Sequence, residues 1–246
     1  MTAPPRPGPC IEVATWVPLR TAQVGPWRVG LSEGFTRRGN SAHLTDPDAD
    51  GAVAALDGVE ERYEAAGQRA IVRLATPRSP EPAPPGLVAS LAARGYRTVS
   101  TTAVLARTVD TVVPRVDGAR LDLAETPGDA WLAGWLGTKA VHTDRGVARR
   151  LLTGSQAVYV TALEGNRVLG TIRAARAGHW VGLSCLTVAA SERRRGLGTW
   201  LTRAALAADP EASHAFLQVE VHHTGALALY RGLGFVEVDE YCYYER

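Results

Sequence analysis

The order of secondary-structure patterns repeats along the chain, and this repeat restricts the fold more than any other feature of the sequence. Residues 226–244 read as a helix, a glycine stop, an aromatic residue and an alternating strand. Residues 86–105 follow the same order, with Gly95 at the stop. Such a pair of similar segments is typical of a diverged internal duplication.

The segments that precede each repeat also correspond. In both halves a strand pattern is followed by a helix and then by a short apolar strand. These elements are expected at residues 27–31, 53–66 and 70–74, and again at 180–188, 197–208 and 215–221. A break falls between the halves at residues 110–117, where a proline interrupts the pattern. We therefore predict an α+β fold with a mixed sheet, in two halves at residues 1–112 and 113–246.

The composition is that of a folded protein outside the membrane. The 246 residues are 46% hydrophobic, which is enough for one large core or two small ones. No apolar run reaches the roughly 18 residues of a membrane helix. The proline-rich residues 1–9 lack the apolar core of a secretory signal. We expect a cytoplasmic protein that has no membrane partner.

The charge balance argues against a nucleic-acid partner. The chain has 27 basic and 25 acidic residues, so its net charge is only +2. Aromatic side chains that could stack on bases do not interleave with the arginine cluster at residues 193–195. The sequence therefore predicts that no nucleic acid is bound.

The chain carries no recognisable metal motif. Its three cysteines are widely spaced, so they form neither a zinc pattern nor a disulfide framework. Cys185 lies in an apolar strand and is expected to be a small buried residue without a catalytic role. His222 and His223 are adjacent, and neighbours on a strand point to opposite faces, so we expect no metal there.

An arginine- and glycine-rich turn lies between a strand and a helix of the second half. Residues 193–198 read Arg-Arg-Arg-Gly-Leu-Gly, directly before an amphipathic helix. Free N–H groups at a helix N-terminus suit a phosphate, and arginines add charge-assisted contacts. A dinucleotide fingerprint is excluded because position 201 is leucine, and a Walker loop because no Gly-Lys-Ser/Thr is present. The turn is therefore a candidate anion site, with a solvated basic turn as the alternative.

This turn and a second motif resemble the GNAT superfamily of N-acetyltransferases. The coenzyme-A motif of that family is Gln/Arg-x-x-Gly-x-Gly/Ala, and Arg193, Gly196 and Gly198 fill its defined places. A following family block runs from a strand into a helix that ends in Leu-Tyr-x-x-Leu-Gly-Phe, as residues 217–235 do here. The resemblance covers residues 120–246 well. The first half resembles the degenerate partner domain of tandem GNAT proteins.

The resemblance implies acetyl-CoA as co-substrate, bound once per chain in the second half. In the family, the pantetheine arm pairs with the strand before the loop, and the loop N–H groups surround the pyrophosphate. The corresponding residues are Leu186, Thr187, Val188, Arg193, Arg194, Arg195, Gly196, Leu197, Gly198 and Thr199. His223 stands where the family often has an asparagine that contacts the cofactor.

The same resemblance implies two catalytic residues. Tyr230 corresponds to the tyrosine that protonates the departing thiolate, a task that suits a phenol with a pKa near 10. Where the family sometimes has a glutamate base this chain has Gln218, and Glu220 lies on the same face of the strand. Glu220 is therefore the candidate base, acting through a water, and His223 is a second candidate because imidazole titrates near neutrality. Direct transfer to a primary amine, without a cysteine intermediate, is expected.

Three features allow alternatives at this level. The alternative function is a catalytically inactive GNAT module that binds an acyl-CoA for sensing or regulation. The polar block from Glu33 to Asn40 reads either as a surface turn or as part of the acceptor cleft. Trp131 and Trp135, four residues apart on a short helix, are interpreted as core rather than as an acceptor wall, although in the family that region often shapes the acceptor pocket. The sequence specifies neither the amine acceptor, a small molecule or a protein, nor the oligomeric state.

Overall fold

The structure is a computed structural model that describes residues 4–45, 51–109, 118–137 and 144–246. Its helices are α1 (Gly8–Thr15), α2 (Leu56–Ala65), α3 (Pro85–Ala93), α4 (Asp129–Leu136), α5 (Arg145–Leu152), α6 (Leu197–Ala207) and α7 (Thr224–Gly232). Its strands are β1 (Arg20–Val24), β2 (Trp27–Leu31), β3 (Ala42–Leu44), β4 (Ile71–Ala75), β5 (Arg97–Thr108), β6 (Arg120–Ala124), β7 (Ala157–Glu164), β8 (Arg167–Ala177), β9 (Trp180–Val188), β10 (His214–Glu220) and β11 (Val236–Glu245). The break expected at residues 110–117, which contains the proposed boundary between the halves, lies outside the described residues.

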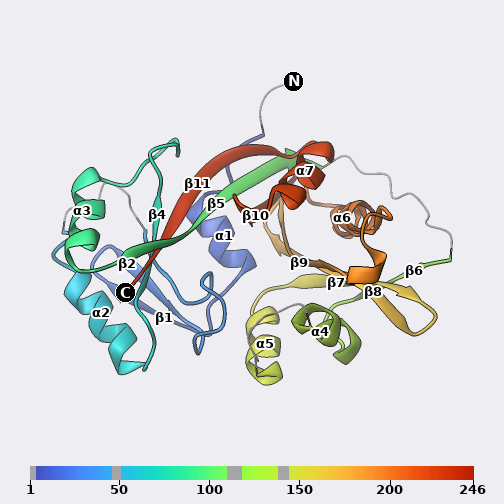
Figure 1. Ribbon diagram of the computed structural model, residues 1–246, viewed down its shortest axis with the longest axis horizontal. Helices are drawn as coiled ribbons and strands as arrows, with labels where there is room; N and C mark the ends of the chain where they lie inside the picture. Colours follow the sequence, from blue (N-terminus) through green and yellow to red (C-terminus); the bar gives the residue numbers. More distant parts are fainter. Residues whose placement is uncertain (1–3, 46–50, 110–117, 138–143) are drawn as a thin grey trace.

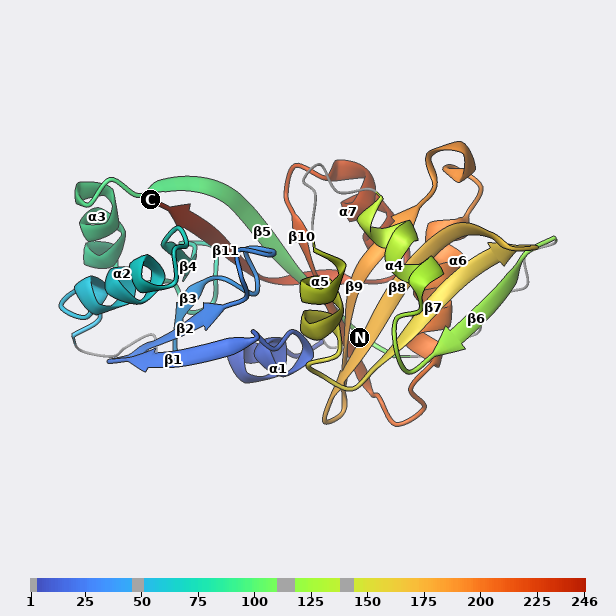
Figure 2. The same ribbon diagram turned by 90° about the horizontal axis from the view of Figure 1, so that it is seen from below.

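The strands form one mixed sheet, which confirms the predicted α+β class. Their order is β1-β2-β3-β4-β11-β5-β10-β9-β8-β7-β6. The pairs β3–β4 and β9–β10 are parallel, and the other neighbours are antiparallel. The sheet follows the long axis of the molecule, with first-half strands at one end and second-half strands at the other (Figure 1, Figure 2).

Exchanged strands join the two halves. β5, which precedes the break in the chain, lies between β10 and β11, both of which follow it. β11 in turn pairs with β4 on its other side. The long β5 and β11 therefore run side by side across the middle of the molecule (Figure 1). Because each half supplies a neighbour to strands of the other, the sheet is continuous through the junction.

Helices cover both faces of the second-half strands. α6 packs above β7, β8 and β9, whereas α4 and α5 lie below them (Figure 1). Successive residues of β8 point to opposite faces of the sheet. Ala174 belongs to the core on the α6 side, and Ala175 belongs to the core on the α4 side. The first half has its own core around Trp27. No helix in the described part of the chain is both long and apolar enough to cross a bilayer.

The parallel strands β9 and β10 separate partway along. Their pairing stops after Leu183 and Leu217. Just beyond this point β9 carries a bulge against β8, at which Cys185 adopts a φ of 60°. A left-handed residue in a strand is strained and bends the strand away from its previous course. The end of β9 therefore follows β8, while β10 continues along β5.

Gly170 on β8 allows the bent end of β9 to approach closely. A Cβ at this position would lie 2.5 Å from the carbonyl oxygen of Thr187 and 2.9 Å from Leu201 Cδ1. Because one of these atoms is backbone, it cannot move aside cheaply. We expect Gly170→Ala to lower the free energy of unfolding by about 1–3 kcal/mol, the usual cost of overpacking. Urea denaturation measures this change.

Gly232→Ala is the matched control for this substitution. Gly232 lies at the end of α7, and a Cβ there would meet no other atom within 4 Å. Its replacement is expected to change the free energy of unfolding by less than about 0.5 kcal/mol. Equal effects at the two glycines would contradict the close approach of β9 and β8.

His43 on β3 makes the stability of the protein sensitive to acid. Burial, together with the charges of Arg73 and Arg28, lowers the pKa of His43 to about 4. Between pH 6.5 and pH 4 the unfolded chain takes up a proton at this histidine and the folded chain does not, so stability is lost as the pH falls. We expect His43→Gln to remove up to about 3 kcal/mol of this pH dependence.

The measurement is urea denaturation of the wild type and His43→Gln at several pH values between 7 and 4. His179→Gln serves as the control, because His179 is exposed in the turn between β8 and β9. If the stability curves of the wild type and His43→Gln ran parallel over this range, the buried neutral state of His43 would be refuted.

Candidate active site

The arginine- and glycine-rich loop forms an anion cradle at the start of α6. Arg194 has a φ of 67° and Gly196 a φ of 79°, so the backbone turns twice through the left-handed region. Gly196 occupies the N-cap position and provides no side-chain cap. Within the described structure, none of the N–H groups of residues 194–199 donates to a protein acceptor. Turns of this kind, at the positive end of a helix dipole, bind anions.

The three arginines of the loop differ in their surroundings. Glu192 is buried, at 4% exposure, and it accepts a hydrogen bond of 2.6 Å from Nη1 of Arg167 and another from Nη1 of Arg195. These contacts, that of Arg167 first, hold the pKa of Glu192 below its usual range, so the carboxylate stays charged. Glu192 therefore neutralises Arg195, whereas Arg193 and Arg194 form no ion pair with any described residue and line a cavity.

We call this space the loop cavity; it has a volume of about 940 Å³. Its lining residues are Leu186, Thr187, Val188, Glu192, Arg193, Arg194, Gly196, Leu197, Gly198, His223, Gly225, Ala226, Ala228 and Leu229. Nine of the predicted cofactor-binding residues are among them. Arg195 and Thr199 are not, and of these two Arg195 is turned toward Glu192. The end of β9, the loop and the start of α7 thus enclose one space, although they are separated in the sequence.

A second space, the inter-half cavity, has a volume of about 490 Å³. It is lined by Trp16, Thr36, Arg37, Arg38, Thr102, Trp135, Leu183, Ser184, Cys185, Leu186, Thr187, Leu217, Gln218, Val219, Glu220, His223, Ala226, Tyr230, Tyr241 and Tyr243. Residues of both halves contribute. The two cavities share Leu186, Thr187, His223 and Ala226. They therefore meet where β9 and β10 separate, and both predicted catalytic residues line the inter-half cavity.

Tyr230 is held at this junction as a neutral phenol. It lies on α7 with 8% exposure, and its ring meets that of Phe235 edge to face with centroids 5.8 Å apart. Burial raises the pKa of Tyr230 well above its usual value, and the nearby Cys185 raises it further. Tyr230 therefore keeps its proton at neutral pH.

Glu220 ends β10 and connects the two halves. Its Oε1 lies 3.3 Å from Nη1 of Arg37, and its Oε2 lies 3.4 Å from Nδ1 of His222. About a third of the Glu220 side chain is exposed, so water reaches the carboxylate. An accessible carboxylate beside a buried phenol provides a possible proton acceptor and a possible proton donor in one cavity.

The expected geometry of the histidine pair is wrong, because β10 already ends at Glu220. His222 and His223 lie in the following turn, and their ring centroids are 4.0 Å apart. Potential ligand atoms of these histidines and of Glu220 lie within 4.8 Å of one another. However, Arg37 already occupies the carboxylate, and His223 caps the positive end of α7. Both features oppose the binding of a cation.

Three residues of the polar block from Glu33 to Asn40, namely Thr36, Arg37 and Arg38, line the inter-half cavity. The buried Asn40 side chain accepts hydrogen bonds from the N–H groups of Ser32 and Gly34 at 2.7 and 3.1 Å. Its Nδ2 donates to the carbonyl oxygens of Phe35 and Thr36 at 2.7 and 2.8 Å. This amide fixes the turn that carries Arg37 and Arg38. The first half therefore contributes part of the cavity wall.

Several lining residues were not expected from the sequence. Trp131 and Trp135 are buried as predicted, but Trp135 also lines the inter-half cavity. Cys185 is not fully buried; at the bulge of β9 it becomes part of the same wall. Tyr241 and Tyr243 share one face of β11, a spacing that alternation along a strand could have revealed. Trp16 follows a short N-terminal helix and carries no sequence signal for this position.

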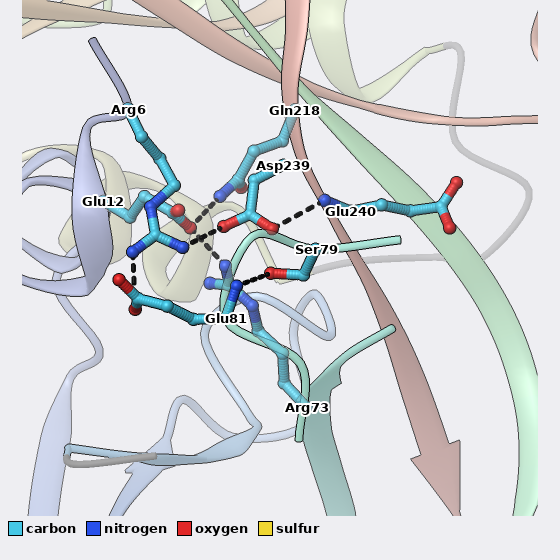
Figure 3. Close-up of polar contacts among 8 residues, drawn as sticks. All are labelled: Arg6, Glu12, Arg73, Ser79, Glu81, Gln218, Asp239 and Glu240. Carbon is cyan, nitrogen blue, oxygen red and sulfur yellow. Dashed lines mark hydrogen bonds and ion pairs between the residues drawn. The ribbon is translucent and has the colours of Figure 1, made fainter. Parts of the chain in front are cut away.

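Two groups of polar contacts join the N-terminal segment to both halves (Figure 3). Glu12 on α1 forms an ion pair of 2.5 Å with Arg73 of β4 and accepts a hydrogen bond from Nε2 of Gln218 on β10. Arg6 contacts Glu81 at 2.5 Å and Asp239 at 3.2 Å. At the position where the family sometimes has a glutamate, this chain thus has the amide of Gln218, and Glu12 orients this amide.

The fold is the one found in GNAT N-acetyltransferases. A family model described as "Probable histone acetyltransferase Rv0428c C-terminal" matches residues 12–244. The match extends over nearly all of the chain, and the chain therefore belongs to this family of GNAT acetyltransferases.

Solved structures agree on the fold. A GCN5-related N-acetyltransferase from Kribbella flavida is 22% identical, with 95% of this chain and 90% of that chain covered and a TM-score of 0.69. A tandem GNAT protein from the clavulanic acid biosynthesis pathway is 18% identical, with 100% and 89% covered and a TM-score of 0.67. A GCN5-related N-acetyltransferase from Sphaerobacter thermophilus is 16% identical, with 84% and 72% covered and a TM-score of 0.60. No curated protein sequence matches this chain.

Proposed function

We propose that the protein moves an acetyl group from acetyl-CoA directly to a primary amine. The observation that carries this proposal is the meeting of two cavities where β9 and β10 separate. One cavity has an anion cradle, and the other holds the buried phenol of Tyr230 and the carboxylate of Glu220. Such an arrangement brings a phosphate-containing donor and an amine together from opposite sides.

The lining of the loop cavity suits coenzyme A. The unpaired N–H groups of residues 194–199 and the side chains of Arg193 and Arg194 match a pyrophosphate. Beyond Leu183 the edge of β9 no longer pairs with β10, so residues 186–188 offer main-chain groups to an amide-containing arm. Acetyl-CoA, when bound, supplies the activated acetyl thioester. The remaining chemistry belongs to the residues of the inter-half cavity.

Two proton movements accompany transfer. The carboxylate of Glu220, through a water, accepts one proton from the ammonium group of the acceptor and passes it to solvent. The amine nitrogen then forms its bond to the acetyl carbon as the thioester carbon–sulfur bond breaks. Tyr230 donates its proton to the departing sulfur and regains one from the nitrogen of the product amide, so the balance is one released proton for each acetyl group moved.

The alternative proposal is a module that binds an acyl-CoA for sensing. Such a module needs the loop cavity but has no use for a proton donor. The position of Tyr230, buried and protonated in the inter-half cavity, favours catalysis. Turnover therefore separates the two proposals, since both include the binding of coenzyme A.

We expect Arg193→Gln and Arg194→Gln each to weaken the binding of coenzyme A about 5- to 50-fold, because each removes a charge-assisted contact to phosphate. The loss should shrink at high salt, where exposed charges are screened. Isothermal titration at two ionic strengths measures both effects.

Arg195→Gln is the matched control within the same loop. Because Glu192 neutralises Arg195, its replacement is expected to change the affinity for coenzyme A less than about threefold. If Arg195→Gln weakened binding as much as the other two substitutions, the assignment of Arg193 and Arg194 to the phosphate groups would be wrong.

We expect Tyr230→Phe to lower the rate of acetyl transfer about 100-fold, which is typical for the loss of a general acid. The affinity for coenzyme A should change little. Release of free thiol, followed with a panel of amines, measures the rate. Tyr96→Phe, which removes a buried hydroxyl in the first-half core, is the control and should leave the rate unchanged. An unaltered rate in Tyr230→Phe would exclude the acid role.

A further inference from the structure

We propose that the acceptor is a small amine that also carries a carboxylate, and that Arg38 binds this carboxylate in the inter-half cavity. The inference rests on the proposed acetyl transfer and names the substrate class of the same site. It follows from an arginine of the cavity lining that forms no ion pair with any described residue, and from a second buried positive charge near the same tryptophan.

Arg38 is an arginine of the cavity lining that forms no ion pair with the residues that the structure describes. It is half-buried, and its guanidinium carbon lies 5.1 Å from the centroid of the Trp16 ring. Burial raises the pKa of the nearby Tyr243 well above its usual value. The positive charge of Arg38 opposes this effect and lowers the pKa of Tyr243. No described carboxylate forms an ion pair with Arg38. Glu220, the acidic residue of the cavity lining, is instead paired with Arg37.

Arg173 adds a second positive charge near Trp16. It is 1% exposed, and its guanidinium carbon lies 5.6 Å from the Trp16 ring centroid. Its hydrogen bonds go to neutral acceptors, which include the carbonyl oxygens of Thr15 and Leu152 at 2.9 Å. No carboxylate in the described structure neutralises it. A positive charge in such a buried place acts strongly on its surroundings and favours an anion nearby.

Two residues of the cavity lining carry buried polar atoms that have no partner among the described residues. Trp16 Nε1, which can only donate, has no acceptor among the described residues. Gln218 Oε1, which can only accept, has no donor there, while its Nε2 is occupied by Glu12. The donor lies in the residue that packs beside Arg38. The acceptor lies on β10, two residues before Glu220.

The charged and acidic groups of the lining orient a zwitterion in the cavity. Its carboxylate end is directed toward Arg38, and its amine end toward Glu220 and Tyr230. A cavity of about 490 Å³ holds a molecule of amino-acid size. The reacting bonds are those of the proposed function: nitrogen joins the acetyl carbon, the carbon–sulfur bond breaks, and the carboxylate takes no part in the proton balance. A lysine in a basic peptide lacks the negative charge that this wall would bind.

The test compares each of the twenty common amino acids with its methyl ester and its amide, together with a basic histone-tail peptide, in assays of thiol release. The ester has a lower amine pKa and is intrinsically more reactive, so a preference for the free carboxylate cannot come from amine reactivity. We expect the best free amino acid to exceed its ester and amide about tenfold or more in kcat/KM. A preferred ester, amide or histone-tail peptide overturns the inference.

Substitutions then assign the preference to Arg38. Arg38→Gln should lower kcat/KM for the free amino acid about tenfold while changing that for its ester less than threefold. Arg37→Gln should lower both alike, because Arg37 acts on Glu220. Arg20→Gln also removes one positive charge, but from the exposed strand β1 at the far end of the sheet. It should change kcat/KM for neither the free amino acid nor its ester. Equal losses for acid and ester in Arg38→Gln would refute the carboxylate contact.

A binding experiment keeps the two proposals distinguishable. Free amino acids and their esters are titrated into protein saturated with coenzyme A, for wild type and Arg38→Gln. Binding that requires the carboxylate and is lost in Arg38→Gln supports the anion site even without turnover, in which case the proposed acetyl transfer alone fails. Turnover of amines without any carboxylate preference leaves the acetyl transfer standing and overturns the inference.

Discussion

The point at which β9 and β10 stop pairing is the constraint on which the rest of the site depends. Hydrogen bonds hold the two strands together only as far as Leu183 and Leu217, and the left-handed backbone at Cys185 then turns β9 toward β8. This divergence leaves a strand edge unpaired inside a sheet, where main-chain groups normally find partners. It also places the end of β9 beside both cavities.

The inter-half cavity exists because the two halves are assembled on one sheet. Arg37 and Arg38 come from a first-half turn that Asn40 fixes, whereas Glu220 and Tyr230 come from the second half. The ion pair between Arg37 and Glu220 crosses this junction. The first half has no arginine- and glycine-rich loop like that at residues 193–198. It nevertheless supplies Arg37 and Arg38 to the cavity that Glu220 and Tyr230 also line.

The sequence predicted the parts of the site that depend on local pattern. The turn at residues 193–198, its helix and the alternating strands were expected correctly, because glycine stops and periodic burial are short-range signals. The pairing of β5 with β10 and β11 was beyond such signals, since contacts between distant strands leave no local pattern. For the same reason the position of Trp16 in the cavity lining could not be predicted. That Arg195 is neutralised and its two neighbours are not depends on the buried Glu192, which no local pattern indicates. The histidine pair was misplaced because β10 ends at Glu220, three residues before His223.

The exchanged strands also bear on how the chain is made. β4 and β5 both pair with β11, whose residues 236–245 follow every other element of the sheet in chain order. During synthesis the first half emerges long before this strand, and the edges of β4 and β5 must wait for it. Contacts of such long sequence separation slow folding and leave strand edges exposed to other chains in the meantime. A stalled or shortened product that lacks β11 would therefore expose two unpaired strand edges, and with them a surface prone to aggregation.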